Sequence, residues 1–406
     1  MFECVTRKRK PLTIAESHLL DPCTTRQVFS VIVPKNQPIN IFYIIWYTFW
    51  TMFKKVLTHT VFSFIVKNKV ASIVTLAVII SSLGGFAAGR YFQETRYTSF
   101  LKGFQNIRED SGKYDYINPL IGSISPPATS VGIFADVKDE VVSYLAKEAK
   151  KEVLYGYSFY FRDLGTGLWF GTNENADFFP ASLFKLPIAI AIYKQGEDVP
   201  EFLKKKVLYT KEISDINDSV QANSKSSLTV GAWYSVDELV RIMLIESDNG
   251  AKNLLLSVLE NRYIDNLFTA VSLVDPSKAK SYTVSSRQYA LFLRILYGSS
   301  YLNEEHSEYL MKILAETKFD QGMVAGLPRN IKVAHKYGVY EFEESVNGVT
   351  RNAEQLHDCG IVYDKEKPYI FCLMTKGKDL EDLYRIISHV SELIYKNQQS
   401  EYQFND

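Results

Sequence analysis

Ser182 and Lys185 form a Ser-x-x-Lys pair within the stretch PASLFKLP at 180–187. Residues three apart lie on one face of a helix, so the lysine amine can take the proton of the serine hydroxyl. The run SLFKLPIAIAIYK predicts an apolar helix that begins at this serine. Ser99 and Ser277 begin the same spacing, but neither precedes an apolar helix. The pattern therefore selects Ser182 as the candidate nucleophile.

Two further polar motifs follow along the chain. The triplet Ser247-Asp248-Asn249 stands between two helical runs, and seen alone it is best explained as a helix N-cap. Lys336 lies in VAHKYG at 333–338, on a predicted strand, where an isolated lysine is most often a solvated charge. Taken together and in this order, the three motifs predict a single site.

The apolar pattern predicts an α+β domain. Alternating aromatic segments indicate strands, and the region from about 182 to 325 is mainly helical. We expect an antiparallel sheet whose two halves are separated in the sequence by a helical insertion. The predicted strands are 154–162, 166–172, 331–340, 357–363 and 368–375, and 378–396 is a closing amphipathic helix.

The three motifs and their surroundings resemble the class A β-lactamase and penicillin-binding serine hydrolase superfamily. The resemblance covers about residues 115–398, within a predicted domain at 115–406. It implies a five-stranded antiparallel sheet flanked by helices, plus a helical subdomain. It also implies an acyl-serine intermediate formed with β-lactams or with peptidoglycan D-Ala-D-Ala peptides, and no cofactor.

The resemblance assigns four catalytic roles. Ser182 is the acylated nucleophile and Lys185 its general base. Ser247 passes a proton to the departing nitrogen. Lys336 supplies positive charge for the substrate carboxylate and for the proton relay.

Substrate-binding roles follow in the same way. Asn249 is expected to hydrogen-bond the substrate amide and to hold Lys185. The backbone N–H groups of Ser182 and Val339 are expected to form the oxyanion hole. Tyr337 and Gly338 complete the third motif. The family has threonine or serine where Tyr337 stands, so the bulk and the phenolic hydroxyl of Tyr337 are expected to alter or obstruct carboxylate recognition.

A second departure concerns release of the acyl group. The family's Glu-x-x-Leu-Asn segment, whose glutamate activates water, is absent between Asn249 and Lys336. The loop is expected to be shortened, and Asp275 is the only acid near it. We therefore expect slow deacylation. A non-catalytic cell-envelope scaffold that keeps the fold, or a serine esterase or amidase, remain the alternatives.

Composition excludes other classes. The chain has 46 basic and 46 acidic residues, so its net charge gives no reason to expect nucleic acid as a partner. The cysteines at 4, 23, 359 and 372 lack the paired spacing of a zinc site, and no metal is expected. The oligomeric state stays open.

Three smaller expectations concern single residues. Cys359 and Cys372 are equidistant from the turn DKEK, so they face each other; a disulfide is sterically allowed, but two buried free thiols are the favoured expectation. His335 points to the opposite face of its strand from Lys336 and is expected to be structural. Glu246 is expected to face solvent.

The amino-terminal region predicts a membrane anchor. Residues 70–89 are uncharged and mostly apolar, long enough for one transmembrane helix, with a buried core helix as the alternative. The aromatic segment 41–53 indicates an interfacial helix within a cytoplasmic tail at 1–69, or else part of a tilted span at 41–66. Residues 90–114 are expected to be a juxtamembrane linker. Because the expected substrates lie outside the cell membrane, the catalytic domain is placed on the extracytoplasmic side of the lipid membrane.

Overall fold

The computed structural model describes residues 73–74, 76–89, 106–108, 114–123, 134–220, 226–274, 282–346, 349–364 and 367–400. The chain divides after Arg90 into two units.

The first unit contains the predicted membrane anchor. Its described residues, 73–74 and 76–89, are helical, and their large apolar side chains are exposed, Phe86 at 70%. Within the described residues, no helix combines the length and the apolar character that crossing a bilayer requires. The predicted segment 41–53 and the rest of 1–69 lie outside them. The span at 70–89, only partly described, stays a prediction.

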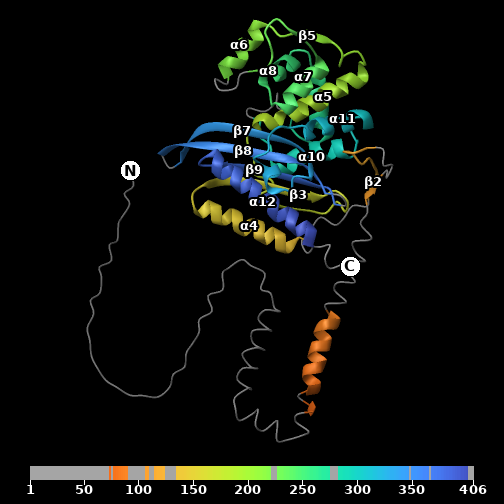
Figure 1. Cartoon of the computed structure of the whole chain (residues 1–406), viewed down its shortest axis with the longest axis vertical. Helices are drawn as coiled ribbons and strands as arrows, with labels where there is room; N and C mark the ends of the chain where they lie inside the picture. Colours follow the sequence, from red (N-terminus) through yellow and green to blue (C-terminus); the bar gives the residue numbers. More distant parts are fainter. Residues whose placement is uncertain are drawn as a thin grey trace, which may run out of the picture. The chain divides into compact units, whose positions relative to one another are not determined.

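The second unit is built on a five-stranded antiparallel sheet, as predicted. The strand order is β4-β3-β9-β8-β7, so segments far apart in the sequence meet where β3 pairs with β9 (Figure 1). The strands are β3 (Leu154–Asp163), β4 (Trp169–Thr172), β7 (Lys332–Val346), β8 (Val349–Tyr363) and β9 (Tyr369–Gly377).

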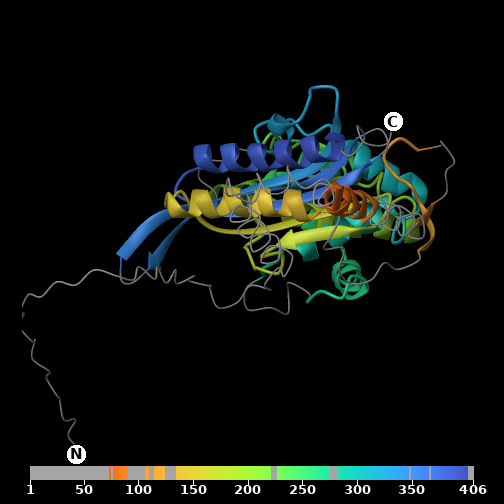
Figure 2. The same ribbon diagram turned by 90° about the horizontal axis from the view of Figure 1, so that it is seen from below.

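Two of these strands are much longer than predicted. β7 and β8 pair without a register shift from Lys332 opposite Tyr363 to Val346 opposite Val349, whereas β9 pairs with β8 only over Glu354–Val362. The far end is therefore a two-stranded ribbon (Figures 1 and 2). The prediction stopped short because glutamate and asparagine, which are depleted in strands, interrupt the apolar pattern there.

Helices cover both faces of the sheet. One face carries α4 (Ala135–Lys150) and α12 (Leu380–Ser400), and the other carries α10 (Ser286–Tyr297) (Figure 1). The remaining elements are β1 (Asn106–Arg108), β2 (Leu120–Ser123), η1 (Ala181–Phe184), α5 (Lys185–Asp198), β5 (Lys206–Leu208), α6 (Lys211–Val220), β6 (Trp233–Ser235), α7 (Val236–Ile245), α8 (Asn249–Leu256), α9 (Asn261–Ala270), α11 (Glu304–Ala315) and η3 (Met323–Gly326).

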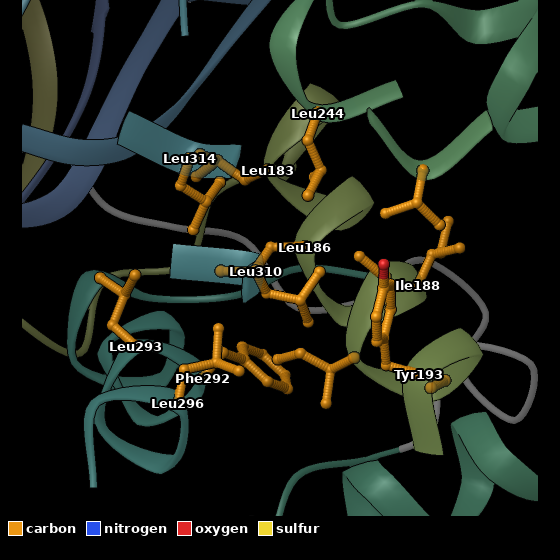
Figure 3. Close-up of a cluster of buried hydrophobic side chains, with 14 of the residues drawn as sticks. Leu183, Leu186, Ile188, Tyr193, Leu244, Phe292, Leu293, Leu296, Leu310 and Leu314 are labelled. Carbon is orange, nitrogen blue, oxygen red and sulfur yellow. The ribbon is translucent and has the colours of Figure 1, made fainter. Parts of the chain in front are cut away.

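The helix α5 is apolar on every side, and it is the central helix of the larger core. Residues 186–193 are all buried. Figure 3 shows Leu183, Leu186 and Ile188 within a cluster that includes leucines of α7, α10 and α11. Burial of each such side chain contributes roughly 1.5–3 kcal/mol. The core therefore fixes the first turn of α5, which begins at Lys185, three residues after Ser182.

The expectation of two free thiols was wrong. Cys359 on β8 and Cys372 on β9 are register partners, and their sulfur atoms are bonded in a disulfide. Directly opposed positions on one face bring the Cβ atoms within bonding reach, so the symmetry about the turn was the better guide. Lys336 pairs with Cys359 from the other side, which places the disulfide in the row of residues that includes Lys336.

Candidate active site

The turn that carries Ser182 is held in an unusual conformation. Ala181 has φ 48°, in the left-handed region that a residue with a Cβ rarely adopts. Such positions cost about 1 kcal/mol or more and persist only where the surroundings hold them. Here fully buried His357 supports the turn, because its Nε2 lies 3.0 Å from the carbonyl oxygen of Phe179.

Gly338 packs directly beneath this turn. A Cβ at this position would lie 3.0 Å from the carbonyl oxygen of Pro180 and 3.2 Å from the backbone nitrogen of Ser182. A larger residue would crowd this approach of β7 to the turn. The backbone of the third motif therefore lies close to that of the first.

The side chains of the three motifs form one connected cluster. Lys185 Nζ lies 2.9 Å from Ser182 Oγ and 3.1 Å from Ser247 Oγ, and it donates to the carbonyl oxygen of Ser247. Lys336 Nζ donates to Ser247 Oγ at 3.0 Å. Ser247 thus bridges the two lysines, as the order of the motifs predicts.

The Ser-Asp-Asn triplet combines a cap with a site. Asp248 caps α8 by accepting a hydrogen bond from the backbone of Ala251 at 2.8 Å, and it also accepts from Ser226 and Ser227. This anchoring fixes Ser247, whose φ of 57° turns its side chain away from regular helix geometry. Asn249 is half-buried at the first position of α8. Capping and chemistry are therefore both encoded in the same three residues.

The buried position of Lys185 favours its neutral form. The side chain is 1% exposed, and the pKa of its amine is lowered to about 6, mainly by burial. The positive charges of Lys336 and Lys252 lower this pKa further, and Asp248 opposes them. A neutral amine 2.9 Å from a serine hydroxyl can act as a general base at neutral pH.

Lys336 is also fully buried. Burial lowers the pKa of its amine to about 7, against the opposing charge of Asp358. Its Nζ lies 4.2 Å from the ring centroid of Tyr337, whose ring stacks on Phe319 at 4.0 Å. The residue that departs from the family pattern therefore contacts the lysine with an aromatic ring, which compensates part of the desolvation of the ammonium group.

The outer edge of β7 faces the nucleophile. Thr317 Oγ1 donates to the carbonyl oxygen of His335 at 3.1 Å, so the backbone groups of His335 point away from β8. Backbone direction alternates along a strand, so the N–H of Val339 also points outward. A Cβ on Gly338, the residue before Val339, would lie 3.2 Å from the backbone nitrogen of Ser182. The two predicted oxyanion-hole donors are thus at neighbouring positions.

Two residues near the motifs lie as the sequence predicts. His335 is buried, with Nδ1 2.7 Å from Asp358, and Glu246 is exposed beside Lys318.

Asp358, His357 and Lys252 also act at the site but were not predicted from the sequence, because a single polar residue in a strand or helix forms no motif. Asp275, Ser99 and Ser277 lie outside the described residues. Among the described residues, no group of His, Cys, Asp or Glu side chains could hold a metal ion.

Comparison with known proteins agrees with this geometry. The model of the beta-lactamase enzyme family matches residues 140–398. The chain belongs to this family. A β-lactamase of Kitasatospora aureofaciens is 26% identical over 191 residues, a match that spans 43% of this chain and 61% of that relative's length.

Solved structures show the fold of class A β-lactamases and PBP-A. A mutant of PBP-A, solved as an acyl-enzyme complex with penicillin G, superposes with a TM-score of 0.54 at 18% identity over 66% of this chain and 97% of that one. The class A β-lactamase of Mycobacterium abscessus gives 0.51 at 19% identity over 63% and 98%. At these identities the likeness establishes the fold, and the chemistry must be argued from the site.

Proposed function

We propose that this family member is a membrane-anchored serine hydrolase that forms an acyl-serine intermediate at Ser182. Its substrates are β-lactams or peptidoglycan D-Ala-D-Ala peptides on the extracytoplasmic side. The observation that carries the proposal is the contact chain from Ser182 through Lys185 and Ser247 to Lys336, with two buried lysines of lowered pKa. A scaffold protein has no need to keep two buried amines, which destabilise the fold.

The reaction follows from the positions of these groups. Neutral Lys185 takes the proton of Ser182 Oγ, which bonds to the substrate carbonyl carbon. The backbone N–H groups of Ser182 and Val339 hold the oxyanion. The proton then moves through Ser247 to the amide nitrogen, and the C–N bond breaks. Lys336 attracts the substrate carboxylate.

Release of the acyl group is proposed to be slow. The chain contains no Glu-x-x-Leu-Asn segment between Asn249 and Lys336. Phe184, immediately before Lys185, packs against two aromatic rings, Phe268 at 6.3 Å and Tyr282 at 5.3 Å between ring centroids. These two rings supply no carboxylate that could activate water. A burst of acylation followed by slow turnover is expected.

Intact-mass measurement on the purified full-length protein tests the proposal. Incubation with penicillin G should add the mass of the whole antibiotic, because ring opening releases no fragment, and the adduct should persist. Ser182→Ala should abolish it. Ser99→Ala and Ser277→Ala, which change the other two Ser-x-x-Lys pairs, should not. The absence of an adduct on the wild-type chain would contradict acylation, and turnover faster than about 10 per second would contradict slow release.

The pH profile of the acylation rate should be bell-shaped with a narrow maximum. It should rise as Lys185 loses its proton near pH 6 and fall as Lys336 loses its charge near pH 7. The second-order rate constant for a fluorescent penicillin, measured from about pH 5 to about 9, checks this. Lys336→Arg keeps the positive charge and should remove the falling limb while the rising limb stays. A profile that is flat over this range would refute the assignment.

A further inference from the structure

Three aromatic side chains form a row that leads away from the nucleophile turn. The rings of Phe179 and Tyr340 are 4.7 Å apart between centroids, and those of Tyr340 and Phe342 are 5.6 Å apart and nearly parallel. Phe179 is 45% exposed and Tyr340 38%. We call these three residues the aromatic ridge. Large apolar groups are rarely left in contact on a surface without a binding role.

The ridge is continuous with the candidate active site. Phe179 stands three residues before Ser182, and Tyr340 stands two residues after Gly338, where an added Cβ would lie 3.2 Å from the backbone nitrogen of Ser182. At roughly 3.3 Å per residue, Phe342 lies about 13 Å along β7 from Gly338. A ligand acylated at Ser182 must be extended to reach the end of the ridge, which a bicyclic β-lactam is not.

The strand that carries the ridge also offers a free edge. β7 is the outermost strand of the sheet in the part of the chain that the structure describes. The backbone of His335 points outward, so alternation directs the N–H and C=O groups of Val339, Glu341 and Glu343 outward too. An extended peptide can pair with such an edge, and its side chains then alternate between the two faces.

The two faces of this edge differ in chemistry. The aromatic ridge lies on one, where Glu344 is neutralised by Arg351 at 2.8 Å and Lys376 at 2.7 Å. Glu341 and Glu343 project from the other and are exposed. A bound strand would therefore meet apolar rings with every second side chain and carboxylates with the side chains between.

We propose that the aromatic ridge and the outer edge of β7 bind the acyl side of an extended peptide donor in which apolar and basic side chains alternate. The proposal rests on the proposed function, because it places the peptide's reacting carbonyl at Ser182. A second copy of this chain is disfavoured as the occupant, since antiparallel self-pairing at Phe342 sets Glu341 against Glu343. The ridge thus selects donors by their length and by the pattern of their side chains.

The test compares acylation by three donors on the full-length chain. All end in D-Ala-D-Ala: one has six acyl-side residues alternating phenylalanine and lysine, one alternates phenylalanine and glutamate, and one has a single acyl-side residue. Acyl adducts are followed by intact mass. Wild type should prefer the lysine donor, and the double variant Tyr340→Ala/Phe342→Ala should lose about tenfold with that donor. Trp233→Ala, which removes a 59% exposed aromatic on β6, should lose nothing.

Two further measurements distinguish a peptide-binding ridge from a general effect on the active site. Labelling by a fluorescent penicillin should be unchanged in the double variant, and Glu341→Lys/Glu343→Lys should reverse the preference between the lysine and glutamate donors. Equal rates for long and short donors, or an equal loss with penicillin, overturn the ridge as a subsite. A wild-type dimer in sedimentation that is absent in the double variant also overturns it.

If neither penicillin nor any donor acylates Ser182, the proposed function is wrong. Fluorescence anisotropy of the labelled lysine peptide then still tests the ridge, and an absence of binding overturns it.

Discussion

Lys185→Met is expected to lower acylation of Ser182 by about 10²- to 10⁴-fold, the range for loss of a general base. Methionine keeps the apolar stem in the core but removes the amine that lies 2.9 Å from Ser182 Oγ. Rapid-mixing measurement with a fluorescent penicillin gives the rate constant. Lys194→Met on the same helix is the control, because Lys194 is 32% exposed and pairs with Glu197 at the surface. A variant that retains a tenth of the wild-type rate would exclude Lys185 as the base.

The same substitution should stabilise the domain. The pKa of Lys185 is lowered to about 6 in the folded chain, from an ordinary value of 10.5. Between these values the unfolded chain binds a proton that the folded chain lacks, so wild-type stability rises with pH across this window. Replacing the buried amine should add about 1–4 kcal/mol to the free energy of unfolding, most at or below pH 6 and less towards pH 10. Denaturant unfolding at several pH values measures this gain.

Gly338→Val is expected to reduce acylation by about 10²-fold, as misplacement by about 1 Å does in other sites. Its Cβ would lie 3.0 Å from the carbonyl oxygen of Pro180, so β7 must move away from the nucleophile turn and separate the two oxyanion-hole donors. Gly156→Val on β3 is the control, since a Cβ there would meet Lys376 and Phe178 only at 3.9 Å.

The melting temperature separates the two explanations for such a loss. If Gly338→Val lowers the melting temperature no more than Gly156→Val but alone loses acylation, the close approach serves the oxyanion hole. A parallel loss of rate in both variants would show that the sheet, and not this contact, limits the reaction.

The three motifs could be located from the sequence because their residue types are unusual for their elements. Ser182 before an apolar helix and Lys336 on a strand are each anomalous, and their shared partner Ser247 joins them in the structure. The closing half of the sheet was also predictable, since the segments 357–363 and 368–375 flank a short polar turn, DKEK. These features depend on local pattern.

What the sequence could not predict depends on contacts across the sheet. His357 contacts the carbonyl oxygen of Phe179, 178 residues away in the sequence, and no local pattern predicts such a contact. The consequence of Tyr337 was equally hidden: its ring is set by stacking on Phe319 and lies against Lys336. The part of the ribbon beyond Tyr340 was missed because its glutamates give the segment a surface composition.

The disulfide between Cys359 and Cys372 makes the activity depend on the redox conditions in which the chain folds. With a sequence separation of 13, it reduces the conformational entropy of the unfolded chain by an amount worth about 3 kcal/mol. It joins β8 to β9, and β8 is the strand that holds β7, with Lys336, onto the sheet. Chains made in a reducing cytosol would lack this bond. The fraction of molecules with a competent site should therefore depend on where the protein matures, while the chemistry of each competent molecule stays the same.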